Sequence, residues 1–190
     1  MPSSTATNRP QHTWDDFIAI EDEDKRELID GELVQLEEPS WQHEAIVASL
    51  GYFLFAWKSA GHGGRVLGSG YKVRVSDRRG VMPDLQFYRR ENAAPAGQEQ
   101  GLVSGRADLL VEIVSPSSRR YDRVTKLRWY AQLGVPEYWV VDPDARTLEQ
   151  LVLRDGSYVI AASLGEEETF RPASFEGLEI RVLDLFEVSA

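Results

Sequence analysis

One carboxylate inside an apolar segment limits what this chain can fold into more than any other residue. The run from Leu109 to Val114 has the composition and alternation of a β-strand, and Glu112 stands within it. A carboxylate buried in such a strand without a partner costs several kcal/mol. The fold must therefore bring a cation to this strand, either a metal ion or a basic side chain such as an arginine.

A second carboxylate and a lysine lie on neighbouring predicted elements. Asp84 follows Met82-Pro83 and opens an alternating run that reads as a strand through residue 88. If the two strands are neighbours, Asp84 and Glu112 can converge on one cation, which would offset their mutual repulsion. Two carboxylates and a lysine are the smallest set of side chains from which a metal-dependent hydrolase can be built.

The candidate lysine is Lys126, on a helix that follows the Glu112 strand after a short loop. It lies one turn after Asp122 and one turn before Tyr130, so the three residues share a helix face. Lys126 can then lean over the carboxyl end of the strand, where it would assist attack by water or offset charge on a phosphate. The alternative interpretation is an ordinary surface pair with Asp122, a contact that contributes only a few tenths of a kcal/mol.

Composition favours one soluble domain. The chain has 190 residues, 42% of them apolar, no cysteine and no uncharged apolar run long enough to cross a membrane. The polar N-terminus lacks the apolar middle of a signal peptide, so we expect a cytoplasmic protein without disulfides or thiolate metal sites. We expect residues 1–12 to form a disordered tail and residues 13–190 to form a single domain.

The charge is distributed unevenly along the chain. A net charge of -10 argues against a protein that coats nucleic acid non-specifically. Residues 61–130, however, hold 13 basic and 7 acidic residues, whereas residues 1–60 and 131–190 each hold 4 and 12. Either the basic residues only cover solvated faces, or four of them rim a polyanion site whose binding is sensitive to salt. These four are Arg119, Arg120, Arg123 and Arg128.

Turn and cap residues predict the elements of the N-terminal half. Thr13 should cap a short helix over residues 14–20, which the acidic residues 21–24 end, and Asp30-Gly31 should form a hairpin turn. A helix over residues 41–60 should bury one face and end near Gly61. That face consists of His43, Val47, Leu50, Leu54 and Trp57. Strands follow at 65–75, 82–88 and 108–114, with a turn at 78–80 and a mobile loop at 91–105.

The C-terminal half continues with alternating elements. A helix over residues 119–133 should turn Val124, Leu127, Tyr130 and Ala131 inward, and a strand follows at 138–142. A hairpin around Asp155-Gly156 should span residues 147–162, and residues 182–186 should form a strand or a helical turn. We interpret Tyr130, Tyr138 and Trp139 as core residues rather than as surfaces for stacked bases.

These motifs resemble the Uma2 family of endonucleases, which looks like a branch of the PD-(D/E)xK nuclease superfamily. The resemblance covers residues 25–142. The segments that carry it are Glu27 to Val34, His43, Pro83-Asp84, Asp108 to Ser117, Asp122, Lys126, Tyr130 and Gly134 to Trp139. One position departs from the superfamily pattern: Val114 stands where its lysine is expected, and Lys126 matches the relocated lysine of the family.

The resemblance implies an α/β fold with a restriction endonuclease-like core of helix, three strands, helix and strand, here with an N-terminal hairpin and a C-terminal β-hairpin. It implies a metal-dependent endonuclease that hydrolyses DNA phosphodiester bonds, with Mg²⁺ or Mn²⁺ held by Asp84 and Glu112. Lys126 would act beside them, and His43 and Glu27 would be further catalytic residues. A homodimer would follow if the protein, like many nucleases, cuts duplexes in pairs, but the sequence does not give the oligomeric state.

Alternatives remain for the two upstream residues and for the whole protein. His43 could be a hydrogen-bonded core residue, and Glu27 could pair with an arginine instead of serving a second cation at the mouth of the site. The protein could be a catalytically weak or inactive module that binds nucleic acid or protein, which would fit its acidic balance and displaced lysine. It could also be a nuclease that a partner regulates through the acidic flanks.

Overall fold

The fold is built on a six-stranded sheet with the order β10-β9-β8-β7-β6-β3. The computed structural model describes residues 11–20, 25–92 and 106–187. Neighbouring strands of this sheet are antiparallel except for β7 and β8, which are parallel. The strands are β3 (Arg65–Gly68), β6 (Leu85–Tyr88), β7 (Leu109–Ile113), β8 (Glu137–Asp142), β9 (Thr147–Arg154) and β10 (Ser157–Gly165).

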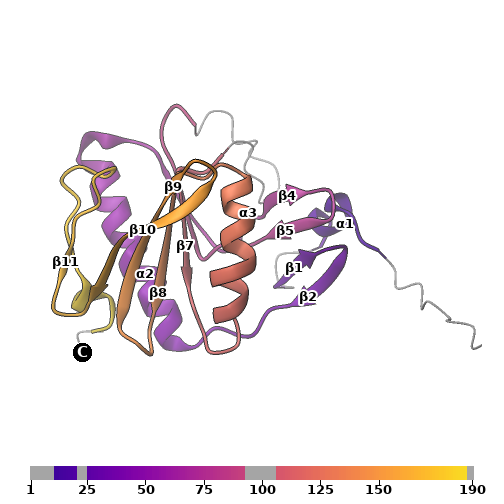
Figure 1. Ribbon diagram of the computed structural model, residues 1–190, viewed down its shortest axis with the longest axis horizontal. Coiled ribbons are helices and arrows are strands. Elements are labelled where there is room, and N and C mark those ends of the chain that lie inside the picture. Colours follow the sequence, from indigo (N-terminus) through magenta and orange to yellow (C-terminus); the bar gives the residue numbers. More distant parts are fainter. Residues whose placement is uncertain (1–10, 21–24, 93–105, 188–190) are drawn as a thin grey trace, which may run out of the picture.

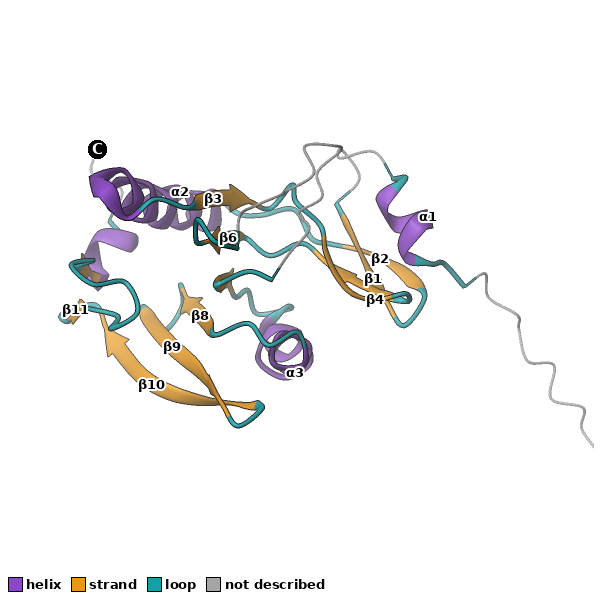
Figure 2. Ribbon diagram, turned by 90° about the horizontal axis from the view of Figure 1, so that it is seen from above, coloured by secondary structure: helices purple, strands orange, loops and turns teal. Residues whose placement is uncertain are grey.

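Two helices cover opposite faces of this sheet (Figures 1 and 2). The first, α2 (Trp41–Trp57), begins at Ser40, whose hydroxyl accepts a hydrogen bond from the backbone N–H of His43. It is followed by a π-helical turn, η1 (Lys58–His62), in which Gly61 has φ 115°. The predicted helix is thus confirmed, with Gly61 at its end.

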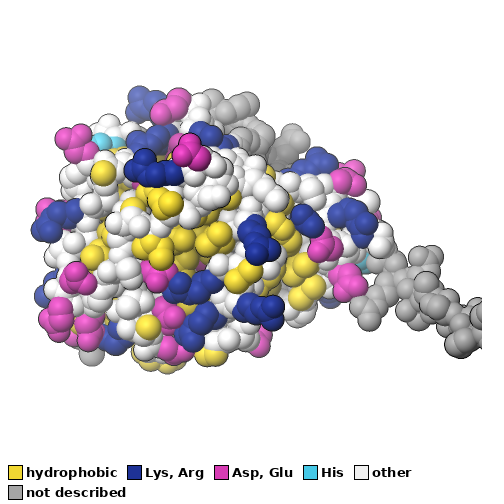
Figure 3. All heavy atoms as spheres, in the orientation of Figure 1, with side chains coloured by type: hydrophobic (Ala, Val, Ile, Leu, Met, Phe, Trp, Pro, Cys, Tyr) yellow, Lys and Arg dark blue, Asp and Glu magenta, His cyan; other side chains and the backbone are white. Residues whose placement is uncertain are grey.

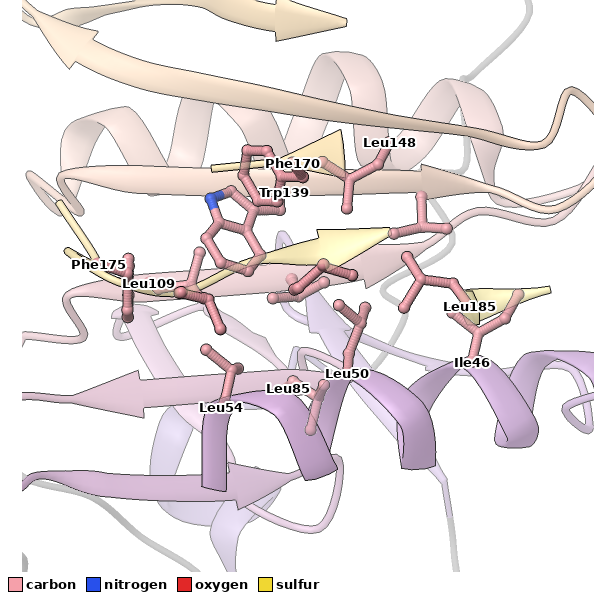
Figure 4. Close-up of a cluster of buried hydrophobic side chains, with 14 of the residues drawn as sticks. Ile46, Leu50, Leu54, Leu85, Leu109, Trp139, Leu148, Phe170, Phe175 and Leu185 are labelled. Atoms are coloured by element: carbon pink, nitrogen blue, oxygen red, sulfur yellow. The ribbon is translucent and has the colours of Figure 1, made fainter. Parts of the chain in front are cut away.

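The buried face of α2 packs on the sheet. Ile46, Leu50 and Leu54 point towards Leu85 and Leu109 of the central strands (Figure 4). The C-terminal segment adds Phe170, Phe175 and Leu185 to the same cluster, together with Trp139 of β8. The predicted face is confirmed at Leu50, Leu54 and Trp57, whereas Val47 only packs at the margin of the core.

The helix on the other face begins with a π-helical segment, η2 (Tyr121–Lys126), and continues as the α-helix α3 (Leu127–Gln132). The predicted helix is confirmed, but its phase differs from the prediction, because Val124 is 40% exposed. Asp122 and Lys126, which are four residues apart on one face of the helix, are buried instead. Tyr130 is buried with them, and the three side chains are directed towards the sheet.

A second, four-stranded sheet has the order β2-β1-β5-β4 and lies beside the first, with the short helix α1 packed on it (Figure 1). Its elements are α1 (Trp14–Ile18), β1 (Arg26–Ile29), β2 (Glu32–Gln35), β4 (Val73–Ser76) and β5 (Arg79–Val81). Thr13 caps α1, and Asp30 and Gly31 have φ values of 51° and 88° at the hairpin turn. Both predictions are confirmed.

Two predictions about the middle strands are wrong. The strand expected at 65–75 divides into β3 and β4, which belong to different sheets, and Tyr71 N–H bonds to the Gly68 carbonyl at the turn between them. The turn expected at 78–80 comes earlier, because Arg79 already starts β5. Gly80 is needed for close packing instead: a Cβ there would lie 2.6 Å from the ring of Phe17.

The C-terminal hairpin of β9 and β10 is confirmed. The chain then forms β11 (Thr169–Phe170), β12 (Ile180–Arg181) and η3 (Val182–Leu185), so the predicted last segment is a helical turn. Tyr130, Tyr138 and Trp139 are fully buried, which confirms them as core residues.

Some predictions fall on residues 1–10, 21–24 and 93–105, outside the described residues. They are most of the N-terminal tail, the acidic end of the first helix and most of the loop at 91–105. His12, the last residue of the predicted tail, donates its N–H to the Gly31 carbonyl. Within the described part of the chain, no helix has both the length and the apolar character needed to cross a membrane.

Candidate active site

Pairing of β6 with β7 brings the two predicted acids together. The β6–β7 ladder pairs Leu85 with Val111. Beyond this pair, the backbone N–H of Ile113 donates to a side chain instead of to a strand carbonyl: Asp84 Oδ2 accepts it at 2.7 Å. Asp84 therefore stands just before β6 rather than inside a strand, which corrects the sequence prediction. Its carboxylate is held at the end of β7, next to Glu112.

Lys126 lies among three carboxylates. Its Nζ is 3.0 Å from Glu112 Oε1, 3.1 Å from Glu27 Oε1 and 3.2 Å from Asp122 Oδ1. Only the Glu112 contact has hydrogen-bond geometry, and Asp122 Oδ1 has no hydrogen-bond partner among the described residues. The ammonium is thus an ion-pair partner for three acids at once, and the surface-pair interpretation of Lys126 is wrong, because the residue is buried.

The lysine remains charged in this environment. Burial by itself lowers the pKa of Lys126, but the charges of Glu112, Glu27 and Asp122 outweigh burial and hold the pKa well above its usual 10.5. One positive charge is nevertheless shared by three buried carboxylates, with Asp84 close by. Glu27 Oε2 is buried and accepts no hydrogen bond from the described part of the chain. The cluster therefore has an excess of negative charge.

Glu112 is the central acid of the cluster. Burial raises its pKa well above the usual 4.5, and the charge of Lys126 opposes this only in part. Its Oε1 also accepts a hydrogen bond from the Tyr130 hydroxyl at 2.5 Å. The cationic partner of Glu112 is thus Lys126, not an arginine.

At a pH above the raised pKa of Glu112, where this carboxyl is ionised, Tyr130→Phe should lower the free energy of unfolding by about 1.5–3 kcal/mol, the range for a hydrogen bond to a charged group. The matched control is Tyr138→Phe, because the Tyr138 hydroxyl donates to a neutral carbonyl, that of Asp122, at 3.3 Å. Tyr138→Phe should lower the free energy of unfolding by only about 0.5–1.5 kcal/mol. Urea denaturation of both variants measures the difference, and equal losses would contradict a charged bond at Glu112.

The raised pKa of Glu112 predicts how stability changes with pH in metal-free buffer. Between pH 4.5 and the raised value, the native state binds a proton that the unfolded state has released. The free energy of unfolding should therefore fall as the pH rises through this interval. Glu112→Gln should flatten the slope, as urea denaturation at a series of pH values can measure. If the substitution leaves the slope unchanged, the pH dependence of the free energy of unfolding comes from titration of other groups.

His43 lies on the same side of the cavity as Asp84. Its Nε2 is 3.2 Å from Asp84 Oδ1, and its side chain is largely buried. Burial tends to lower the pKa of His43, but the hydrogen bond and charge of Asp84 exceed that effect and raise it above 6.5. His43 is therefore paired with a site carboxylate and is not merely a core residue of α2.

Glu27 differs in position from the prediction. Its side chain is 0% exposed, and its Oε1 accepts the backbone N–H of Met82 at 2.9 Å. It lies behind Lys126 rather than at the mouth of the site, because β1 is covered by the core that α1 and Met82 form. Its cationic partner is Lys126 instead of an arginine.

The four predicted arginines lie around the helix, with differing partners. Arg119 contacts Asp142 and Asp144, and Arg123 contacts Glu149. Arg120 and Arg128 are exposed. On the face that carries α3, basic side chains gather with acidic ones between them (Figure 3).

A cavity of about 520 Å³ opens over the acid cluster and Lys126. His43, Asp84, Glu112, Asp122 and Lys126 line it, and the serine-rich segment at 115–118 forms part of its wall. The predicted residues Asp84, Glu112, Lys126 and His43 thus meet at one cavity, with Glu27 behind them. Four elements or their ends supply them: α2, β6, β7 and η2.

Two residues at the site were not among the predicted site residues. Asp122 shares the Lys126 face in the sequence, a spacing that could have placed it in the acid cluster. Tyr121 lines the cavity with a buried hydroxyl that has no hydrogen-bond partner within the described ranges. No pattern in the sequence distinguishes Tyr121 from an ordinary core aromatic residue.

The donor set suits a hard divalent cation. Carboxylate oxygens are the ligands that Mg²⁺ and Mn²⁺ prefer, and the excess of buried acid would favour such an ion. Within the described residues, no three acidic or histidine side chains are grouped tightly enough to hold a metal alone. An ion at Asp84 and Glu112 would therefore take its other ligands from water and substrate.

The fold and the family of this chain are shown by its likeness to known proteins. The chain is similar to the crystal structure of a "putative nuclease belonging to DUF820" from Anabaena variabilis, with a TM-score of 0.75 and 19% identity over 92% of this chain and 97% of that chain. That likeness shows a shared fold, the restriction endonuclease-like α/β fold. No curated protein matches the chain. The model of the family Uma2, described as "Putative restriction endonuclease", matches residues 14–184, and the chain therefore belongs to the Uma2 family.

Proposed function

We propose that this protein is a metal-dependent endonuclease that hydrolyses phosphodiester bonds of DNA. The observation that carries the proposal is the meeting of Asp84, Glu112 and Lys126 at one cavity, on neighbouring strands and the helix that follows them. Membership of a nuclease family supports the reaction class. The DNA substrate and the metal requirement rest on the chemistry of the cavity.

Charge is the physical reason for a metal. Glu27, Asp84, Glu112 and Asp122 surround one lysine and one histidine, so even a protonated His43 leaves the cluster negative. A negative cavity repels a phosphodiester unless a cation is added. Asp84 and Glu112 would hold Mg²⁺ or Mn²⁺. When bound, the ion polarises the phosphoryl group and lowers the pKa of a coordinated water.

The side chains of the cavity have separate roles in this proposal. The Lys126 ammonium, charged at neutral pH, offsets the negative charge that develops on the phosphate. His43 Nε2 lies 3.2 Å from Asp84 Oδ1, which raises the pKa of His43, and the imidazole is placed to give or accept a proton at the site. Tyr130 positions Glu112 through its hydrogen bond, and Glu27 positions Lys126 from behind.

DNA would approach over the helix that carries the four arginines. Arg120 and Arg128 are the better candidates for phosphate contacts, since Arg119 and Arg123 are engaged with acids. The slope of log affinity against log salt is negative. Replacing Arg120 and Arg128 by Ala should make it shallower by about 0.9 for each phosphate that is no longer neutralised. Replacing Arg119 and Arg123 should change the slope less. Fluorescence anisotropy with a labelled duplex measures both, and a slope unchanged in the first variant would remove this helix from the interface.

The proposal is tested by a cleavage screen against single-stranded, duplex and branched DNA and RNA with Mg²⁺ or Mn²⁺. The control is the double variant Asp84→Ala and Glu112→Ala, which should be inactive on every substrate. DNA cleavage that needs the metal and both acids would support the proposal. Salt-sensitive binding without cleavage would favour the alternative of a catalytically inactive nucleic-acid-binding module. A lack of any binding at low salt would favour a protein-interaction module.

A further inference from the structure

The outer face of α2 carries large aromatic side chains in solvent. Trp41, Tyr52 and Phe55 are 71%, 69% and 57% exposed. α2 lies on the outside of the six-stranded sheet, and in Figure 2 no described element covers its outer side. Helices that face water normally carry polar residues there, so this helix is apolar on both faces. Exposed aromatic residues of this size mark an interaction surface.

The exposed aromatic side chains belong to a regular stripe, in which Ala48 is exposed and Ala45 is half-buried. Trp41, Ala48 and Phe55 are spaced by seven residues, and Ala45 and Tyr52 fall four residues after the first two. These are the a and d positions of a heptad, the pattern by which one helix packs along another. The stripe lies opposite the buried face formed by Ile46, Leu50, Leu54 and Trp57. It carries no charged residue.

We propose that this stripe, residues 41, 45, 48, 52 and 55, is the interface for a second copy of the chain. The stripe is complementary to itself. About a two-fold axis at Ala48, antiparallel helices would bring Trp41 of each copy against Phe55 of the other, because both lie seven residues from the axis. Tyr52 of each copy would lie over Ala45 of the other, where the small side chain leaves room for the ring.

The available area is adequate for such a contact. Since a buried aromatic side chain removes about 150–250 Å² from water, the three exposed rings offer on the order of 400 Å² per chain. Two copies would then bury on the order of 800 Å² through the rings alone, and the alanines and flanking side chains bring this towards the roughly 1,000 Å² of a specific interface. None of the five stripe residues can neutralise a phosphate, as binding of DNA requires, and the Lys58 ammonium beside them already lies 4.7 Å from the centroid of the Phe55 ring.

Another exposed apolar region, on strand β10, fits a second copy less well. Strand β10 is an edge of the large sheet, and its Ile160 is 63% exposed. A register shift between Ile160 and Ala162 interrupts its ladder, however, and such bulges protect edge strands from pairing with another chain. Ile160 therefore provides a matched control for the aromatic residues of α2.

The first experiment compares oligomeric states by sedimentation at micromolar concentration. The wild type should sediment at twice the chain mass of 21.4 kDa. The variant Tyr52→Glu with Phe55→Glu should be monomeric with an unchanged circular dichroism spectrum, because both side chains are exposed. Ile160→Glu should remain dimeric. A monomeric wild type, or a dimer that survives the double substitution or is lost in Ile160→Glu, would overturn the proposal.

The second experiment locates the axis. The chain has no cysteine, so a single introduced thiol reports one contact. Under mild oxidation, Ala48→Cys should form a disulfide-linked dimer, and Ala56→Cys should not, since the axis would place the two copies of residue 56 far apart. Cross-linking at residue 56 and not at residue 48 would refute the antiparallel arrangement. Neither experiment depends on nuclease activity, so the dimer and the proposed function can fail separately.

Discussion

Asp84→Asn and Glu112→Gln should each abolish binding of Mn²⁺ and reduce metal-dependent DNA cleavage by on the order of 10³-fold or more. Each variant keeps the shape of the side chain but removes the charge that would hold the ion. Asp84 Oδ2 already accepts the Ile113 N–H, so the asparagine can keep its place at the end of β7 through its amide oxygen. Isothermal titration calorimetry and a duplex cleavage assay measure the two losses.

The matched control is Asp144→Asn. Asp144 also lines the cavity, but it is exposed and pairs with Arg119 instead of the acid cluster. Its substitution should leave Mn²⁺ affinity within twofold of wild type. Wild-type affinity in both Asp84→Asn and Glu112→Gln would show that these acids do not form a metal site.

The same two variants also distinguish a metal site from a structural salt bridge. Because four acids compete for one lysine, neutralising one of them relieves repulsion, and the metal-free protein should be as stable as wild type or slightly more stable. A large drop in the melting temperature of either variant would indicate that the charge serves stability.

Lys126→Ala should lower the free energy of unfolding by about 3–5 kcal/mol, the range for removing one partner of a buried ion pair. The substitution leaves Glu27, Glu112 and Asp122 buried without their shared cation. The control is Arg128→Ala on the same helix, which is exposed and should change stability by no more than about 0.5 kcal/mol. Adding Glu112→Gln to Lys126→Ala should recover part of the loss, because one fewer charge is left unpaired. Urea denaturation of all four proteins tests this, and a loss near that of Arg128→Ala would contradict the ion-pair cluster.

The catalytic role of Lys126 is measured separately, at a temperature where the variant is folded. Lys126→Ala should keep its Mn²⁺ affinity but slow cleavage by roughly 10²-fold or more. Lys126→Arg should restore activity only in part, because the larger, forked guanidinium cannot take the place of the compact ammonium among the three acids.

The superfamily position of the lysine provides a sharper test. Val114 lines the same cavity as Lys126, so Val114→Lys in the Lys126→Ala background should regain activity if the two positions serve one site. Full activity of Lys126→Ala alone would remove the lysine from the proposed mechanism.

Local chemistry was sufficient to predict much of the fold. The Asp30-Gly31 and Asp155-Gly156 turns, the cap at Thr13 and the apolar strand around Glu112 follow from backbone preference and side-chain period, which act over a few residues. The meeting of Asp84 and Glu112 was also predictable, because consecutive strands often pair and their ends then coincide.

Longer-range features were decided only by the tertiary structure. No local pattern places Glu27 behind Lys126, since β1 and the helix that carries Lys126 are far apart in the sequence and meet only when the second sheet packs beside the first. The same holds for His43 against Asp84 and for the division of residues 65–75 between two sheets. The exposure of Val124 and the burial of Asp122 and Lys126 depend on which face of the helix packs on the sheet. The sequence by itself determined which residue types the strands and helices present, whereas packing decided which charges share one cation, because ion pairs form through space and depend on the distances that the whole fold sets.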